Sequence, residues 1–299
     1  MPFVEKPIMK LTNNILTIEV SEHGAEMQSL TKGNRQYLWT GDAQFWNRRD
    51  PILFPSVGKP YNNEIHANGV AYPLHQHGYA RDSEFEVLAS DNEHELHLRM
   101  LENEFSQGYP YRLGLEVRYQ LEGSVVKAVW CVKNLDNKEA YFQIGGHPGF
   151  LLPDYDPDKM VNGYIRLYNK EGKLVAPTLT SDIDDGCRIP RSSKVILLRE
   201  TPLMPDTFLH DALIIEEGQV TKVELWDRHG NPVLNVDCPQ ADAYGIWAPH
   251  KKGCPFVCLE PWCGICDSKG FTDDISKRQY IHRLAPGETY TFTYTIEIY

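Results

Sequence analysis

The sequence has no long apolar run. No stretch of the 299-residue chain approaches the roughly 18 to 20 consecutive apolar residues that a membrane-spanning helix requires. Met1–Lys6 also lacks the apolar segment of a secretory signal peptide. We therefore expect no membrane partner and a cytoplasmic location.

Basic residues are outnumbered by acidic ones. The chain holds 30 Lys and Arg against 41 Asp and Glu, which gives a formal net charge of -11 at pH 7. Proteins that bind the phosphate backbone need clustered Lys and Arg to displace its counterions. The balance therefore excludes nucleic acid as an expected partner.

Cysteines are few for a disulfide framework, since seven is an odd number and they are scattered through a large chain. Four of them cluster as Cys254, Cys258, Cys263 and Cys266. This C-x3-C-x4-C-x2-C run lies in a strongly apolar segment and does not form two C-x2-C zinc knuckles. Buried reduced thiols are the main interpretation, and a zinc site is the alternative.

Helical periodicity is also scarce, whereas alternation of apolar and polar residues is frequent. It predicts strands over Asn14–Val20, Glu95–Met100, Leu113–Leu121 and Thr289–Tyr299, separated by turn-forming residues such as Pro286 and Gly287. Asp206 is a candidate cap for one short helical turn. With no repeat and no linker, we predict an all-β fold: one domain over residues 1–299, a large antiparallel β-sandwich with few short helices.

The run Gly145-Gly146-His147-Pro148-Gly149 places an imidazole on a stiff bend after an apolar stretch. Glycine permits a close approach of the backbone, and proline fixes the exit from the bend. Because the unperturbed pKa of histidine lies near neutrality, His147 is a candidate general acid or base. A structural histidine in a tight turn is the alternative.

Glu260 is the second candidate for proton transfer. It follows the apolar residues Phe256–Leu259 and precedes Pro261-Trp262, so we expect it to face a buried pocket. Burial raises the pKa of a carboxyl group and makes its charged form costly. A buried glutamate therefore needs a partner or a catalytic role, and a structural ion pair is the alternative.

Two further segments concentrate polar side chains. His75–Asp82 holds two imidazoles, an amide, a guanidinium and a carboxylate, which is typical of a site. In a strand, His75 and His77 would share one face and could bind a metal ion, although no further ligands lie at a diagnostic spacing. Arg48 and Arg49 precede a proline-bounded apolar strand, and either side chain could point inward or into solvent.

Together these segments resemble the aldose 1-epimerase family, the galactose mutarotase-like proteins, and most closely its LacX-like branch. The resemblance covers nearly the whole chain and rests on the order of its motifs. They include residues 14–16, 24–27, 37–39, 49–55, 77–82, 145–150 and 259–262. The family implies a β-supersandwich with a sugar-binding cleft and no metal or organic cofactor.

The implied reaction interconverts the α and β anomers of a hexose through the open-chain aldehyde. A base removes the proton from the C1 hydroxyl while an acid protonates the ring oxygen O5. The resemblance assigns the acid to His147, held protonated by a neighbouring carboxylate, and the base to Glu260.

The resemblance also implies a set of substrate-binding residues. His77 would bind near O5, an arginine at Arg49 or Arg48 would bind hydroxyls, and Asp211 would fix a diol. Trp247 would face the sugar's C–H surface, although a core tryptophan is an equal alternative. Arg81 resembles an arginine of the hexose-6-phosphate 1-epimerase branch, so a phosphorylated substrate stays open.

We therefore expect a small-molecule sugar as the substrate, no cofactor, and a monomer or homodimer. Two other classes stay open: a non-catalytic carbohydrate-binding or sensing protein that kept the cleft, and a metal-dependent enzyme that uses His75 and His77.

Overall fold

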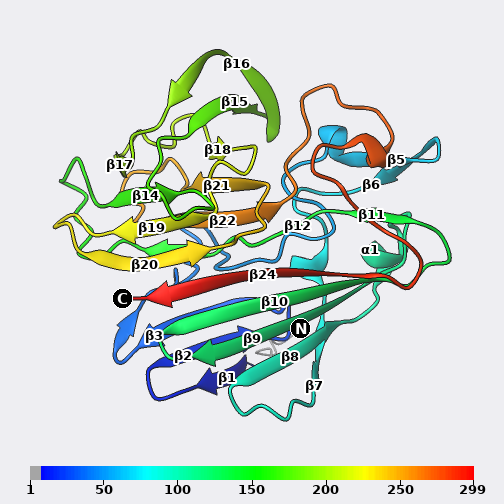
Figure 1. The fold of residues 1–299 in the computed structure, drawn as a ribbon, viewed down its shortest axis with the longest axis horizontal. Coiled ribbons are helices and arrows are strands. Elements are labelled where there is room, and N and C mark those ends of the chain that lie inside the picture. Colours follow the sequence, from blue (N-terminus) through cyan, green and yellow to red (C-terminus); the bar gives the residue numbers. More distant parts are fainter. Residues whose placement is uncertain (1–7) are drawn as a thin grey trace.

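Strands dominate the computed structural model, which describes residues 8–299 (Figure 1). Helical structure in this range is confined to α1 (Glu104–Gln107) and three short 3-10 turns: η1 (Tyr61–Asn63), η2 (Ala80–Asp82) and η3 (Ile275–Lys277). The predicted all-β architecture with few short helices is confirmed. Asp206 lies at a hydrogen-bonded turn in which Leu209 N–H donates to its carbonyl, and no helix forms there.

The largest sheet has nine strands, and every neighbouring pair is antiparallel. In sheet order the strands are β17 (Glu200–Pro202), β14 (Tyr164–Tyr168), β19 (Lys222–Trp226), β20 (Pro232–Asp237), β24 (Thr289–Ile298), β10 (Val125–Asn134), β9 (Leu113–Glu122), β8 (Glu95–Met100) and β7 (Phe85–Leu88).

Two further sheets pack against it. The first contains β1 (Ile8–Thr12), β2 (Leu16–Ser21), β3 (Met27–Lys32) and β4 (Arg35–Gln36). The second contains β12 (Ile144–Gly145), β22 (Phe256–Cys263), β21 (Ala243–Trp247) and β18 (Leu213–Ile215), with β13 (Gly149–Leu151) also paired to β22.

Three two-stranded sheets complete the architecture. They are β5 (Glu64–Ala67) with β6 (Val70–Pro73), β11 (Ala140–Phe142) with β23 (His282–Leu284), and β15 (Thr178–Asp184) with β16 (Cys187–Ile196).

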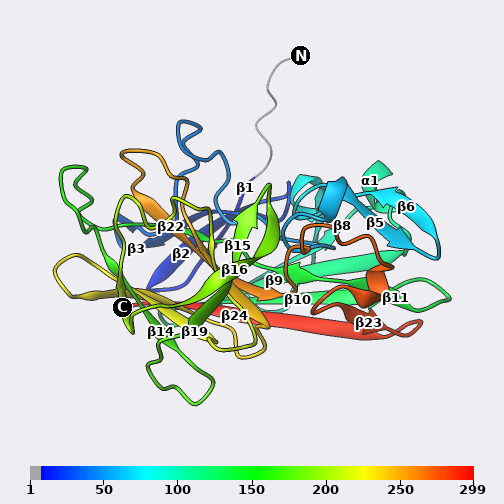
Figure 2. The same cartoon turned by 90° about the horizontal axis from the view of Figure 1, so that it is seen from above.

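The layers are held by the apolar faces of the strands. Burial alternates residue by residue along β9, β10 and β24, so one face of each strand enters the core. Strands β1–β3 lie over β9, β10 and β24 (Figure 2), and the Tyr119 hydroxyl donates to the Ala25 carbonyl at 3.0 Å between these layers. The Tyr244 hydroxyl of β21 likewise donates to the Thr221 carbonyl at 2.9 Å, which joins the second sheet to the nine-stranded one.

Strand β22 has no solvent-exposed face, since all its residues are buried. This strand carries Glu260 and forms the floor of the site described below. Between residues 8 and 299, no helix has the length and apolar character needed to cross a membrane.

Candidate active site

A cavity of about 350 Å³ opens beside β22. Six of the predicted site residues line it: His77, Arg81, His147, Asp211, Trp247 and Glu260. The wall also includes residues that were not predicted to bind substrate: Trp46, Gly58, Gln76, Ile183, Gly186, Ala212, Ile214, Trp262 and Cys266. The lining therefore joins segments that are far apart in the sequence.

His147 and Glu260 form a buried pair within this cavity. His147 Nε2 lies 3.2 Å from Glu260 Oε2, and the two residues are only 7% and 2% exposed. Backbone pairing brings them together. Gly146 N–H donates to the carbonyl of Pro261 at 3.0 Å, and Leu259 N–H donates to that of Pro148 at 3.1 Å.

The electrostatics of the pair differ from the sequence prediction. Burial lowers the pKa of His147 to about 3, and the charges of Arg81 and Arg48 act in the same direction. Burial also raises the pKa of Glu260 well above its ordinary value, with a contribution from the Asp211 charge. The expectation that His147 is held protonated is therefore wrong, since burial favours the neutral imidazole and the protonated carboxyl.

Asp50 contacts the backbone of His147, and its role was not identified from the sequence. It is fully buried, and its carboxylate is contacted by the backbone N–H of His147. The Tyr294 hydroxyl donates to Asp50 Oδ2 at 3.4 Å. Burial, followed by the charge of Glu26, raises the pKa of Asp50 well above its ordinary value.

His77 is buried and lies beside His147, with the two ring centroids 5.5 Å apart. The N–H of Gly58 donates to His77 Nδ1 at 3.1 Å, so Nδ1 is an acceptor and the neutral ring carries its proton on Nε2. Burial lowers the pKa of His77 well below its ordinary value, which also favours the neutral ring. His77 Nε2 lies 3.3 Å from the side-chain amide nitrogen of Gln76, which also lines the cavity, so any hydrogen bond from His77 to a ligand oxygen would form beside this amide.

His75 does not join His77 as a metal ligand. The predicted strand is a turn in which His77 has a φ of 68°, and His75 is exposed. Among residues 8–299, the side-chain groups spaced to hold a metal ion do not include His75 or His77. The structure therefore does not support the alternative of a His-x-His metal pair, which assumed an extended backbone.

Tryptophan rings surround the imidazole of His147. The ring of Trp46 stacks on it with centroids 4.8 Å apart, and Trp247 approaches edge-on at 5.8 Å. Trp46 lies in a loop without periodic pattern, so the sequence offered no signal for it. The two rings give the cavity the flat apolar surface that sugars commonly contact.

Trp262 is held next to Glu260 by two glycines. A Cβ atom on Gly145 would lie 2.8 Å from its indole, and one on Gly245 would lie 2.3 Å from it. Only a residue without a side chain fits at either position. The Gly145 of the bend thus has a clear packing role.

The three predicted arginines occupy different places. Arg81 lines the cavity, and its Nη2 donates to the carbonyl of Gln76 at 2.7 Å. Arg48 pairs with Asp82 at 2.6 Å and is not among the lining residues, although its charge reaches His77 and His147. Arg49 is not among the lining residues either, and its Nη1 donates to Gln28 Oε1 at 2.6 Å. Neither of the two candidate arginines therefore lines the cavity, and Arg81 is the cation on its wall.

Asp211 stands at the cavity mouth with an exposed side chain. Its φ is 71°, a conformation that aspartate tolerates better than most residues. The carboxylate accepts the N–H of Ala212 at 2.8 Å and leaves further acceptor capacity for a ligand hydroxyl.

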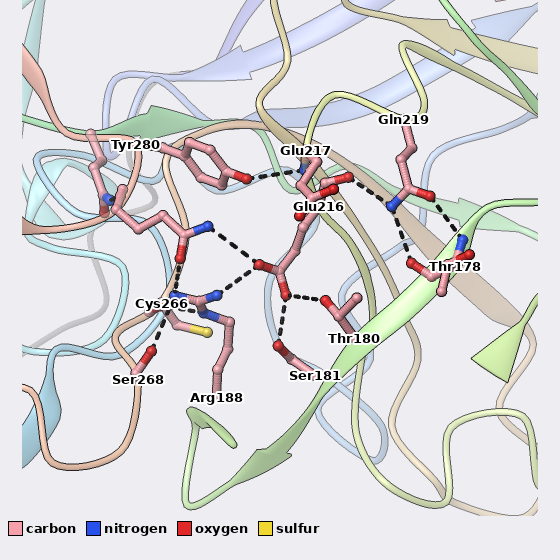
Figure 3. Close-up of polar contacts among 12 residues, drawn as sticks. Thr178, Thr180, Ser181, Arg188, Glu216, Glu217, Gln219, Cys266, Ser268 and Tyr280 are labelled. Carbon is pink, nitrogen blue, oxygen red and sulfur yellow. Dashed lines mark hydrogen bonds and ion pairs between the residues drawn. The ribbon is translucent and has the colours of Figure 1, made fainter. Parts of the chain in front are cut away.

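The far wall is the hairpin β15–β16, which contributes Ile183 and the turn residue Gly186. A buried ion pair anchors it: Arg188 Nη1 lies 2.7 Å from Glu216 Oε2 (Figure 3). Ser181 also donates to Glu216, at 2.7 Å, and Arg188 Nε donates to the carbonyl of Cys266 at 3.0 Å. This network joins the hairpin to Glu216, which directly follows β18, and to Cys266 on the cavity wall.

The clustered cysteines separate in space. The Cys258 thiol lies next to His147 and Glu260, and one potential ligand atom from each of these three residues lies within 4.8 Å of the others. Cys266 lines the cavity, whereas Cys263 belongs to a different group with Asp242 and His282. All seven cysteines are free thiols, as the main interpretation predicted.

A cavity of this size with aromatic walls and a few convergent polar groups is the usual form of a small-molecule site. Its fold and its motifs are those of a known family. The chain matches the Aldose 1-epimerase family model over residues 7–297 and belongs to that family.

Relatives and solved structures agree with this membership. The chain is 27% identical to the plasmid and chromosomal LacX proteins of Lactococcus lactis subsp. lactis, over 97% of this chain and 99% of each relative. A galactose mutarotase related enzyme from Lactobacillus acidophilus superposes with a TM-score of 0.89 at 28% identity, covering 98% of this chain and 97% of that chain. A galactose mutarotase-like protein from Lactobacillus casei gives 0.87 at 27% identity, covering 98% and 100%.

Proposed function

We propose that the protein is an aldose 1-epimerase that interconverts the α and β anomers of a hexose through ring opening. The observation that carries this proposal is the buried contact of 3.2 Å between His147 Nε2 and Glu260 Oε2 inside a cavity of suitable size. Ring opening needs one proton donor and one proton acceptor near the same carbon atom, and this pair supplies both.

In the forward step, Glu260 takes the proton from the C1 hydroxyl and His147 gives a proton to O5. The C1–O5 bond breaks as the C1–O1 bond becomes a carbonyl. The C1–C2 bond then rotates and exposes the other face of the carbonyl. Ring closure reverses both transfers, so each group returns to its starting state.

The electrostatics of the cavity favour one of the two protonation states in this cycle. Ring opening starts from imidazolium with carboxylate and ends with neutral imidazole and protonated carboxyl. The second state is the one that burial favours, and it is also the state required for ring closure. The two states hold the same number of protons and differ only in which member of the pair, 3.2 Å apart, carries the proton.

The other lining residues have roles in binding. His77 donates to a ring or hydroxyl oxygen from Nε2, Asp211 accepts from sugar hydroxyls, and Trp247 covers a C–H face of the ring. Arg81 favours a substrate that carries an anionic group, which keeps a hexose 6-phosphate as the second candidate substrate. This chemistry requires no cofactor. A cytoplasmic location and a monomeric or homodimeric state remain predictions from the sequence.

The test is anomer-exchange NMR on a panel of aldoses and aldose 6-phosphates. We expect catalytic amounts of protein to accelerate exchange between the anomeric signals of at least one sugar. Binding of a sugar without faster exchange would instead support the carbohydrate-binding class. Activity restricted to the phosphorylated members would favour the hexose 6-phosphate as the substrate, with Arg81 as the candidate phosphate ligand.

A further inference from the structure

A second cluster of chemically active side chains lies away from the cavity. It contains Asp242, from the connection before β21, Cys263 at the end of β22 and His282 at the start of β23. Along β22, Glu260 and Trp262 line the cavity, so strand alternation turns Cys263 to the opposite face. The cluster thus joins three separate segments behind the active site.

The ligand atoms of the cluster have the spacing of a shared cation. The sulfur, imidazole nitrogen and carboxylate oxygen all lie within 4.8 Å of one another. His282 Nε2 is 3.6 Å from Asp242 Oδ2, which is too long for a hydrogen bond. Two tetrahedral ligands about 2.0 to 2.1 Å from one zinc ion are about 3.4 Å apart, so the observed gap suits an ion between them.

Two of these atoms lack other partners. His282 Nε2 and Asp242 Oδ2 are buried and have no hydrogen-bond partner among residues 8–299. Burying a polar atom without a partner costs stability, and such atoms are uncommon in folded proteins. The thiol of Cys263 donates to the carbonyl of Gln240 at 3.1 Å, a contact that its deprotonation would release.

The chemistry of the three side chains suits a cation as well. A thiol, a carboxyl group and an imidazole bind a divalent metal ion in their deprotonated forms, so metal binding displaces the protons that these groups would otherwise hold.

We propose that Asp242, Cys263 and His282 bind a divalent metal ion of the zinc class. Sulfur, nitrogen and oxygen ligands all bind Zn²⁺ in proteins, and this site offers one of each. Three protein ligands leave one tetrahedral position for water. The ion would tie β22 and β23 to the connection before β21 and would thereby stiffen the strand that carries Glu260.

The other group with ligand spacing is a different case. His147 and Glu260 face the sugar cavity, where both exchange protons with the proposed substrate, and Cys258 lies behind them. The two groups share no residue, so single substitutions distinguish them.

The experiment uses the purified full chain after dialysis against a chelator. Co²⁺ is titrated in and followed by its thiolate charge-transfer absorption, and Zn²⁺ is then used to displace it. We expect one Co²⁺ per chain with the thiolate band, its displacement by stoichiometric Zn²⁺, and a higher thermal midpoint with Zn²⁺ than with chelator.

Substitutions then locate the site. Cys263→Ser should remove the thiolate band, and His282→Gln should weaken Zn²⁺ binding at least about 10-fold, the loss that even an outer-shell partner can cause. Cys258→Ser is the matched control and should keep the band. The Co²⁺ titration of the wild type still tests the proposal if a variant fails to fold.

Three results would overturn the proposal. The first is a wild type that takes up no Co²⁺ with a thiolate band. The second is a band lost in Cys258→Ser and retained in Cys263→Ser. The third is a Cys238–Cys263 disulfide in the purified protein that, once reduced, gives no metal uptake.

Discussion

His147 Nε2 and Glu260 Oε2 lie 3.2 Å apart, although the two residues come from distant parts of the chain and are both almost fully buried. Burial shifts their pKa values in opposite directions, which favours one proton on the pair, carried by the Glu260 carboxyl. The same pair can then act as donor and acceptor in ring opening.

The first prediction concerns catalysis by the pair. His147→Ala and Glu260→Gln should each lower the rate of anomer exchange by about 10² to 10⁴-fold, the usual contribution of a positioned acid or base. NMR exchange or polarimetry measures the rate, and thermal unfolding checks that each variant folds. His75→Ala is the control and should keep full activity because His75 is exposed and outside the cavity. Full activity in both variants would disprove the assignment.

The second prediction concerns stability against pH. Because the pKa of Glu260 is raised in the folded state, the folded protein holds a proton that the unfolded chain releases above about pH 4.5. His147, with its pKa lowered to about 3, has the opposite effect between pH 3 and 6.5 and none above that range. Above pH 6.5 the Glu260 contribution therefore falls with rising pH, by up to about 1.4 kcal/mol per unit until the folded pKa is reached.

Glu260→Gln removes this pH dependence. As the pH rises from 6.5, the thermal midpoint of the variant minus that of the wild type should therefore increase. Differential scanning calorimetry across this range measures the difference. Asp50 also has a raised pKa, but it is present in both proteins and cancels in the comparison. Parallel curves for the two proteins would mean that Glu260 is ionised in the fold.

The third prediction concerns substrate binding by Asp211. Asp211→Asn should raise KM for the preferred sugar by about 10 to 100-fold, the value of a hydrogen bond to a charged group. It should change kcat less than Glu260→Gln does. Asp91→Asn, another exposed aspartate outside the cavity, provides the comparison. An unchanged KM would exclude Asp211 from the binding site.

The fourth prediction concerns the anchor of the hairpin β15–β16. Arg188→Met should lower the free energy of unfolding by about 3 to 5 kcal/mol, because it leaves the Glu216 carboxylate buried without its partner. Denaturant unfolding measures the loss. Glu86→Gln, which breaks the exposed pair with Arg99, should cost at most about 1 kcal/mol. Equal losses in the two variants would mean that burial does not strengthen the pair.

Strand positions could be read from local pattern. The predicted strand Leu113–Leu121 is β9 (Leu113–Glu122), and Thr289–Tyr299 is β24 (Thr289–Ile298). Alternation succeeds here because each strand buries one face, and that requirement acts on neighbouring residues. It failed for His75 and His77, where a left-handed residue reverses the chain and leaves no strand on which the two rings could align.

The sequence by itself determined the β-rich architecture and the candidate pair, because period-two burial and the residue types around His147 and Glu260 are local properties. Only the tertiary structure decided the rest. The stack of Trp46 on His147, the hydrogen bond of Arg49 to Gln28 and the place of Arg81 on the cavity wall depend on contacts between distant segments. The pKa directions of the pair also required the fold, since they arise from burial and from charges that no sequence spacing encodes.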